Sequence, residues 1–263
     1  MKKALIGYTG FVGSNLQTQI KFDDFYNSKN IQDIKNKEYD VVYCAGAPAA
    51  KWIANQKPTE DLQSVCSLID AIREVKTKRF VLISTVDVYK EIIDVDEDSF
   101  IDLSNHHAYG THRRIIETFV SERFENYNII RLPGLFGDGL KKNIIYDFLH
   151  DNETFKIHSE AVFQFYSLDT LAKDIQKIID ANINLINFAT EPTSVKEVIK
   201  AGFDIDFDNK PTPNAPFYDM HTKYAEIFGE YGTYIQSKKE VLQKVKEFVQ
   251  RKKAKLWNYQ FQI

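Results

Sequence analysis

The residues Lys3–Gly13, which read KALIGYTGFVG, decide the fold of this chain. The apolar start predicts a buried strand, Gly7, Gly10 and Gly13 follow at intervals of three, and Phe11–Ile20 has the apolar spacing of a helix packed on a sheet. Glycines suit such a turn because they accept positive φ and carry no Cβ, so peptide N–H groups can approach a pyrophosphate. The stretch therefore predicts a dinucleotide-binding turn followed by a helix whose positive end faces the phosphates, and the alternative is a glycine turn without a ligand.

Composition limits the class of protein. The 263 residues, 43% of them hydrophobic, predict one sizeable globular domain or a domain with a smaller appendage. The net charge of -3 offers no basic field for nucleic acid, and we interpret the local basic cluster as a solvated helix end; it contains Arg251, Lys252, Lys253 and Lys255. No apolar stretch approaches the ~20 residues of a membrane span, and no signal-peptide region precedes the first strand. We therefore expect a cytoplasmic protein without nucleic-acid or membrane partners, and we expect Cys44 and Cys66 to be buried free thiols.

Strand-like and helix-like segments alternate along the first half of the chain. Apolar runs at Asp24–Tyr26, Val41–Ala47, Arg79–Thr85 and Asn126–Leu132 predict parallel strands of a doubly wound α/β sheet. A helix is expected between Thr59 and Lys76, and its apolar face is wide enough for burial on two sides, one of which would be a contact in a homodimer. That face is formed by Leu62, Val65, Cys66, Leu68, Ile69 and Ile72.

The end of the second strand bears on which dinucleotide is bound. An acidic side chain there accepts hydrogen bonds from the ribose 2′-hydroxyl of NAD, whereas a basic or small polar one tolerates the 2′-phosphate of NADP. The chain reads Tyr26-Asn27-Ser28-Lys29-Asn30 at this point and carries no carboxylate. We therefore predict NADP in preference to NAD, and a solvated turn without a role in discrimination is the alternative.

Five segments together resemble the extended short-chain dehydrogenase/reductase family, which contains nucleotide-sugar epimerases, dehydratases and reductases. They are GYTGFVG at 7–13, CAGA at 44–47, STVDVY at 84–89, YGTHR at 109–113 and RLPGLFG at 131–137. The resemblance implies a Rossmann-like NAD(P)-binding domain formed by residues 1–133 and about 162–186. It also implies a smaller substrate-binding region, formed by residues 134–161 and 187–263, and a nucleotide sugar as substrate.

The resemblance also assigns residues to the cofactor and to the reaction. The expected cofactor-binding residues are Gly7, Thr9, Gly10, Phe11, Val12, Gly13, Asn27, Ser28, Lys29, Ala45, Gly46, Leu132 and Pro133. Thr85 matches the residue that hydrogen-bonds the reacting oxygen, and Tyr109 matches the general acid or base. In the family a lysine four residues after the tyrosine supports the phenolate and holds the ribose, but this chain has Arg113 there.

The arginine leaves two interpretations open. Arginine keeps the positive charge and can donate to two ribose hydroxyls, so it can support a phenolate at Tyr109 in a working but altered site. It stays charged at every working pH and cannot relay a proton. The alternative is a dinucleotide-binding sensor or scaffold without hydride transfer, and a third reading is a carbonyl reductase whose substrate has no nucleotide.

Substrate contacts are expected from Asp87 and from Asn143 together with Lys141 or Lys142, with loop solvation as the alternative for each. Three histidines, His106, His107 and His112, flank Tyr109, but no Cys or carboxylate pair completes a ligand set, so no metal is predicted. The sequence thus predicts an NAD(P)-dependent oxidoreductase, epimerase or dehydratase that acts on a nucleotide-linked sugar.

Overall fold

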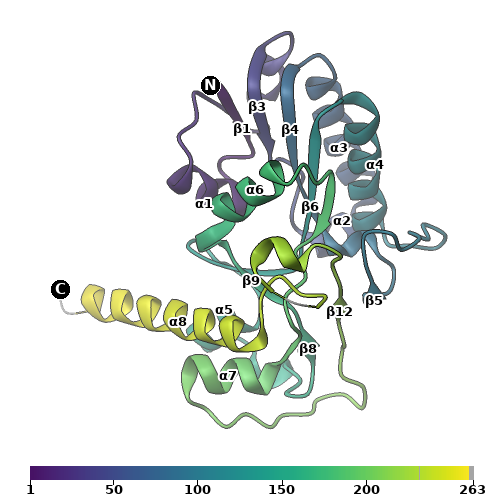
Figure 1. Ribbon diagram of the computed structural model, residues 1–263. Coiled ribbons are helices and arrows are strands. Elements are labelled where there is room, and N and C mark those ends of the chain that lie inside the picture. Colours follow the sequence, from purple (N-terminus) through teal and green to yellow (C-terminus); the bar gives the residue numbers. More distant parts are fainter. Residues whose placement is uncertain (231, 261–263) are drawn as a thin grey trace.

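The structure is a computed structural model that describes residues 1–230 and 232–260. Its centre is a six-stranded sheet in which every pairing is parallel, with the strand order β10-β6-β4-β3-β1-β2 (Figure 1). The strands are β1 (Lys3–Ile6), β2 (Asp24–Tyr26), β3 (Glu38–Cys44), β4 (Lys76–Thr85), β6 (Tyr127–Leu132) and β10 (Leu185–Asn187). The prediction of a Rossmann-like doubly wound sheet is confirmed.

The order of these strands indicates where along the sheet a ligand is expected to bind. Strand β1 lies between β2 and β3, so the direction of winding reverses between β1 and β3, the point at which open α/β sheets bind their ligands. The connection from β2 to β3 contains only the 3₁₀ turn η1 (Ile31–Ile34). Numbered along the chain, the sheet is therefore 2-1-3-4-5-6 and differs from the common 3-2-1-4-5-6 dinucleotide-binding order at this edge.

Helices cover both faces of the sheet. Helices α3 (Pro58–Arg73) and α4 (Ala108–Arg123) cover one face, and α1 (Phe11–Gln19) and α6 (Leu171–Asp180) cover the other (Figure 1). Side chains alternate between these layers, because successive residues of a strand point to opposite faces. Strand β1 illustrates this: Ala4 and Ile6 are buried against α3 and α4, and Leu5 against α1 and α6.

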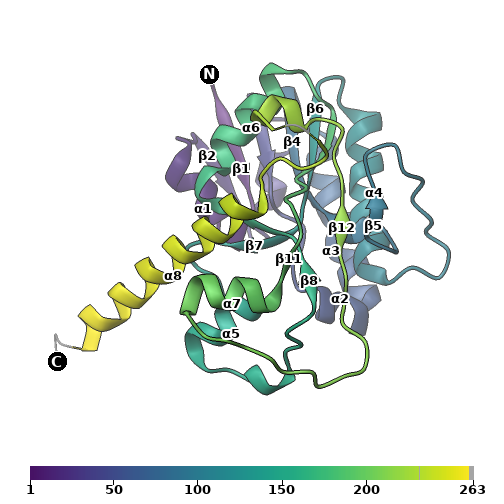
Figure 2. The ribbon, with the colours of Figure 1, turned by 60° about the horizontal axis from the view of Figure 1, so that its bottom comes forward.

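The second half of the chain builds a smaller region beyond the ends of the sheet strands, shown from two directions in Figures 1 and 2. Helices α5 (Ile144–His150), α7 (Val195–Phe203) and α8 (Lys238–Gln260) share one apolar core. Two two-stranded ladders adjoin them: β7 (Gly134–Phe136) with β9 (Phe165–Ser167), and β8 (Val162–Phe163) with β11 (Thr193–Ser194). A third ladder, β5 (Ile93–Val95) with β12 (Asp219–Met220), packs on residues 86–92 instead. Short 3₁₀ turns occur at η2 (Val86–Val88), η3 (Thr154–Lys156), η4 (Leu168–Thr170) and η5 (Ala225–Phe228). Within the described residues, no helix combines the length and the apolar character needed to cross a membrane.

The basic end of helix α8 is solvated as predicted, with Arg251, Lys253 and Lys255 exposed, and two of its charges also form ion pairs. Arg251 forms an ion pair with Asp169 at 3.1 Å, and Lys252 forms one with Asp138 at 2.7 Å. The Lys252 pair lowers the pKa of Asp138, because a nearby ammonium stabilises the carboxylate. Helix α8 is therefore attached to the loop at residues 137–143.

One expectation about the cysteines is wrong. Cys66 is exposed on α3, whereas Cys44 is buried as predicted and burial raises the pKa of its thiol to about 11. The connection between β3 and α3 contains a short helix, α2 (Lys51–Gln56).

Candidate active site

A cleft of about 1450 Å³ opens where β1, β3, β4 and β6 end. It exceeds the ~300–1,000 Å³ of a pocket for a single drug-sized ligand, so it has room for a dinucleotide and a second molecule. Most predicted site residues line it: Gly7, Thr9, Gly10, Phe11, Val12, Asn27, Ser28, Ala45, Gly46, Thr85, Asp87, Tyr109, Arg113, Leu132, Pro133 and Asn143. Gly13 and Lys29 are the predicted residues that do not.

The glycine turn fits the phosphates of a dinucleotide. Gly7 has φ +85°, and a Cβ there would lie 2.3 Å from the carbonyl oxygen of Ala45. A Cβ on Gly13 would lie 2.1 Å from the carbonyl oxygen of Gly7, so this glycine allows close packing of α1 rather than contact with a ligand. Gly10 caps α1 without a side-chain hydrogen bond, which leaves the first N–H groups of the helix open to an anion.

The turn after β2 lines one end of the cleft through Asn27 and Ser28. Asn27 stabilises this turn, because its Oδ1 accepts from the Lys29 N–H at 2.9 Å and its Nδ2 donates to the Tyr8 hydroxyl at 3.2 Å. The acidic residues that line the cleft are Glu60 and Asp87, and neither belongs to this turn.

Tyr109 lies at the start of α4 and is 8% exposed. Burial raises the pKa of its phenol above the ordinary value of 10.0; the Arg113 charge opposes that shift, Asp87 reinforces it, and hydrogen bonding to Thr85 opposes it. The Arg113 charge thus favours the phenolate, as expected, but burial outweighs it and the net direction of the pKa shift is upward. The phenol is suited to donate a proton.

Arg113 is directed at α3. Its Nη1 donates to Asp61 Oδ2 at 2.5 Å and its Nη2 to Asp61 Oδ1 at 3.0 Å, and Nη2 also donates to the Pro48 carbonyl. The guanidinium carbon lies 4.1 Å from the centre of the Tyr109 ring, a cation–π contact. Nε of Arg113 is buried without a hydrogen-bond partner among the described residues.

Asp61, which the sequence analysis missed, also accepts from His112 Nδ1 at 2.7 Å. Burial acts to raise the pKa of Asp61, but the hydrogen bonds from Arg113 and His112 outweigh burial and hold that pKa below its usual range. His112 therefore faces α3 and not a substrate.

Helix α2, also missed, contributes two residues. Lys51 Nζ pairs with Asp87 Oδ1 at 2.6 Å, and the Thr85 hydroxyl donates to Asp87 Oδ2 at 3.2 Å. Asn55 Oδ1 accepts from the backbone N–H of Tyr109 at 3.0 Å. A helix of six residues is too short to show a helical periodicity in the sequence. The polar residues after CAGA are the only sequence signal for this side of the cleft.

A buried ionic network joins the helix and strands that carry Thr85 and Tyr109 in the cleft. Glu117 of α4 accepts from Arg131 Nη2 of β6 at 2.7 Å and from the Ser84 hydroxyl of β4 at 2.6 Å. Arg131 Nη1 donates to the Tyr89 hydroxyl at 2.6 Å. Because α4, β4 and β6 share this network, Thr85 and Tyr109 are held at a constant spacing.

Other candidate residues have structural partners. The side chain of Asn143 caps α5, with Oδ1 accepting from Ile145 N at 3.0 Å and Nδ2 donating to Leu135 O at 2.9 Å. His107 caps α4, and His106 Nε2 lies 2.9 Å from the Asp87 carbonyl. Gln164 is buried, and its Nε2 donates to the carbonyl oxygens of Thr190 and Met220.

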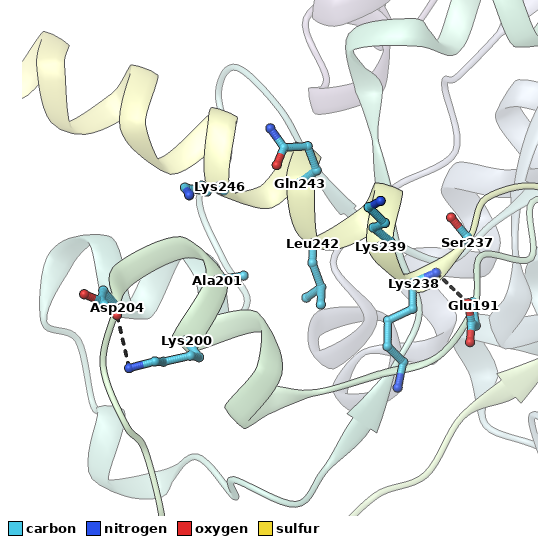
Figure 3. A pocket seen from close by; sticks show the side chains of 10 residues that line it. All are labelled: Glu191, Lys200, Ala201, Asp204, Ser237, Lys238, Lys239, Leu242, Gln243 and Lys246. Carbon is cyan, nitrogen blue, oxygen red and sulfur yellow. Dashed lines mark hydrogen bonds and ion pairs between the residues drawn. The ribbon is translucent and has the colours of Figure 1, made fainter.

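Two features lie outside the cleft. A shallower hollow between α7 and α8 (Figure 3) holds none of the predicted site residues, and its Lys200 is paired with Asp204 at 3.1 Å. Asp94, Asp219 and His221 place potential metal-ligating atoms within 4.8 Å of one another, and Tyr234 donates to Asp219 at 2.7 Å.

The chain belongs to a family of NAD(P)H-binding proteins, whose family model matches residues 23–166. The fold is that of the extended short-chain dehydrogenase/reductases, and the cofactor class is NAD(P). A sequence search of curated proteins finds no significant match.

Solved structures similar to the chain are sugar-nucleotide enzymes. UDP-glucose 4-epimerase from Thermotoga maritima is 15% identical with a TM-score of 0.72, over 97% of this chain and 100% of that one. A dTDP-4-dehydrorhamnose reductase from Clostridium acetobutylicum is 20% identical with a TM-score of 0.70, over 96% and 100%. An NAD-dependent NDP-hexosamine 5,6-dehydratase of tunicamycin biosynthesis is 15% identical with a TM-score of 0.71, over 97% and 98%.

Proposed function

We propose that this protein is an NAD(P)-dependent oxidoreductase, epimerase or dehydratase that acts on a nucleotide-linked sugar. The observation that carries the proposal is the position of Thr85 and Tyr109, which line the same cleft as the glycine turn. The similar folds of an epimerase, a reductase and a dehydratase of sugar nucleotides support this class of substrate.

Each of the site residues has a separate role in the proposed reaction. Thr85 orients the reacting oxygen, and Tyr109 exchanges a proton with it: the phenol donates the proton when a carbonyl is reduced, and the phenolate accepts it when a hydroxyl is oxidised. Arg113 fixes the Tyr109 ring through the cation–π contact. NAD(P), when bound, supplies the exchange of hydride with the same carbon atom. The glycine turn and the residues Ala45, Gly46, Leu132 and Pro133 hold it.

The preferred cofactor is NADP. Asn27 and Ser28 line the cleft after β2 without a carboxylate that would repel a 2′-phosphate. Lys29 follows in the same turn, and its charge favours the phosphate from outside the cleft. Residues 134–161 and 187–263 form the proposed substrate-binding region, and Asp87 and Asn143 are the proposed substrate contacts. We assign the protein to the cytoplasm, where reducing conditions would keep Cys44 and Cys66 as free thiols.

A second candidate is a dinucleotide sensor or scaffold without hydride transfer. It is favoured by the pairing of Arg113 with Asp61, because a guanidinium bound to a buried carboxylate offers less charge to a phenolate and a ribose than a free lysine would.

One experiment separates the two candidates. NADH or NADPH is mixed with the protein and with keto-sugar nucleotides of the UDP, GDP and dTDP series, and both thermal stabilisation and loss of the reduced-cofactor absorbance are measured. An enzyme of the proposed class is stabilised by a nucleotide sugar and oxidises the cofactor. Binding of the cofactor without its oxidation by any keto sugar would establish the sensor.

A further inference from the structure

Two lysine side chains stand at the reacting end of the cleft. Lys51 of α2 pairs with Asp87 at 2.6 Å, and Asp87 is in turn hydrogen-bonded to Thr85. Lys142 reaches from the loop before α5 to the carbonyl oxygen of Ala49 at 2.9 Å, two residues from Lys51. We refer to Lys51 and Lys142 as the lysine pair; both line the cleft.

The two positive charges of the lysine pair are not balanced by an equal number of carboxylates. Arg113 is neutralised by Asp61, and the two ammonium groups of the lysine pair have one carboxylate partner, Asp87. The other charged residues that line the cleft are Lys141 and Glu60. Among the described residues, no carboxylate lies within 4.0 Å of Lys142 Nζ, and a neutral carbonyl is its hydrogen-bond partner. Lys142 is exposed at the rim of the cleft. Partial desolvation of its ammonium group lowers its pKa, and the negative charge of Asp87 acts to raise that pKa. An anion at this point would restore the balance of charge.

We infer that the lysine pair binds an anionic group carried by the sugar itself, and that the substrate is a nucleotide-linked uronic acid. This inference rests on the proposed function. The diphosphate of a nucleotide sugar is attached to the anomeric oxygen, whereas Lys51 contacts the Asp87 carboxylate that accepts from Thr85, and Lys142 is bonded two residues away at Ala49. A carboxylate at the far carbon of the ring would accept from both ammonium groups as a charge-assisted hydrogen-bond partner.

The test compares matched nucleotide sugars that differ only in a carboxylate or a hydroxymethyl group. The affinities of UDP-glucuronate and UDP-glucose, and of the corresponding GDP-mannose, dTDP-glucose and UDP-galactose pairs, are measured by titration calorimetry with NADPH bound. We expect at least one uronate to bind about tenfold more tightly than its neutral partner. The double variant Lys51→Met, Lys142→Met should reduce that preference to less than about twofold.

The control variant is Lys239→Met, a lysine of the hollow between α7 and α8 (Figure 3), which should keep the preference. Equal affinities within every pair would overturn the inference alone. An equal loss of both members in the double variant would assign the lysine pair to the diphosphate, and a parallel loss of NADPH affinity would assign it to the cofactor; either result also overturns it. If no nucleotide sugar bound, the proposed function would fall together with the inference.

Discussion

Both carboxylate oxygens of Asp61 hold the guanidinium of Arg113, with N–O distances of 2.5 Å and 3.0 Å. The arginine that replaces the expected lysine thus has a partner on a neighbouring helix, and the two helices are joined beside the reacting end of the cleft. Arg113 is 3% exposed, so this ion pair is largely shielded from water. Removing one member of a buried ion pair destabilises the folded state far more than replacing both members with apolar residues.

The Asp61→Asn variant should therefore lose about 3–5 kcal/mol of unfolding free energy, because it leaves a buried guanidinium without a counter-charge. Urea denaturation measures this loss. The double variant Asp61→Leu, Arg113→Met serves as the matched control and should be more stable than Asp61→Asn. If Asp61→Asn unfolded at the same urea concentration as the parent protein, the pair would have no structural role.

Tyr109→Phe should lower turnover at least about 100-fold, because the proton donor is removed. The dissociation constant of NADPH should stay within about twofold, because the glycine turn is unchanged. Tyr127→Phe, at the first residue of β6 and outside the cleft lining, is the control and should retain turnover. Steady-state rates and cofactor fluorescence provide the two readouts, and full activity of Tyr109→Phe would remove the phenol from the reaction.

The raised pKa of Tyr109 sets the direction of the pH dependence. The phenol stays protonated below that pKa, so the rate of reduction should be flat from about pH 6 to about pH 9 and fall only in stronger alkali. The rate of oxidation should rise with pH throughout this range. Arg113 opposes the upward shift, so Arg113→Met should move both profiles to higher pH. A reduction rate that falls near pH 7 would contradict this assignment.

Ser28→Asp should reverse the preference for NADP. A carboxylate after β2 repels the 2′-phosphate and accepts hydrogen bonds from the 2′-hydroxyl of NAD. We expect NADPH to bind at least about tenfold more weakly and NADH more tightly, as measured by fluorescence titration. Ser28→Asn is the neutral control of equal size and should keep the parent preference; the same shift in Ser28→Asn would indicate a steric effect.

Exposed apolar side chains on α2, α3 and α4 predict a homodimer contact. Trp52, Leu62 and Ile115 lie on these three helices, which touch one another, and Trp52 is 63% exposed. The double variant Trp52→Asp, Leu62→Asp should be monomeric in light scattering at concentrations where the parent protein is a dimer. Phe155→Asp, on η3 of the smaller region, is the control and should leave the oligomeric state unchanged. A parent protein that is monomeric at every concentration would refute the contact.

The sequence was sufficient to predict the parallel sheet and the glycine turn, because both depend on local patterns. Alternating apolar runs and helix-like segments give the doubly wound fold, and the spacing of Gly7, Gly10 and Gly13 gives the turn. The relative placement of Thr85 and Tyr109 followed from the family resemblance.

The contacts that tune the site could not be predicted in the same way. Asp61 lies 52 residues from Arg113, and Lys51 lies 36 residues from Asp87, so neither pair leaves a periodic signal. Burial also decides the pKa of Tyr109, and burial depends on packing across α2, α3 and α4. The identity of a charged residue can be read from the sequence, but its counter-charge is set by tertiary structure.

The ion pair between Lys252 and Asp138 has a consequence for the order of folding. All six strands of the main sheet lie before residue 188, so a chain emerging from the ribosome can form that sheet before α8 is synthesised. The loop that carries Lys142 is fixed by α8 more than 100 residues later in the chain. The dinucleotide half can therefore be complete while the opposite wall is still unformed, and a nascent chain should acquire cofactor affinity before it acquires substrate selectivity.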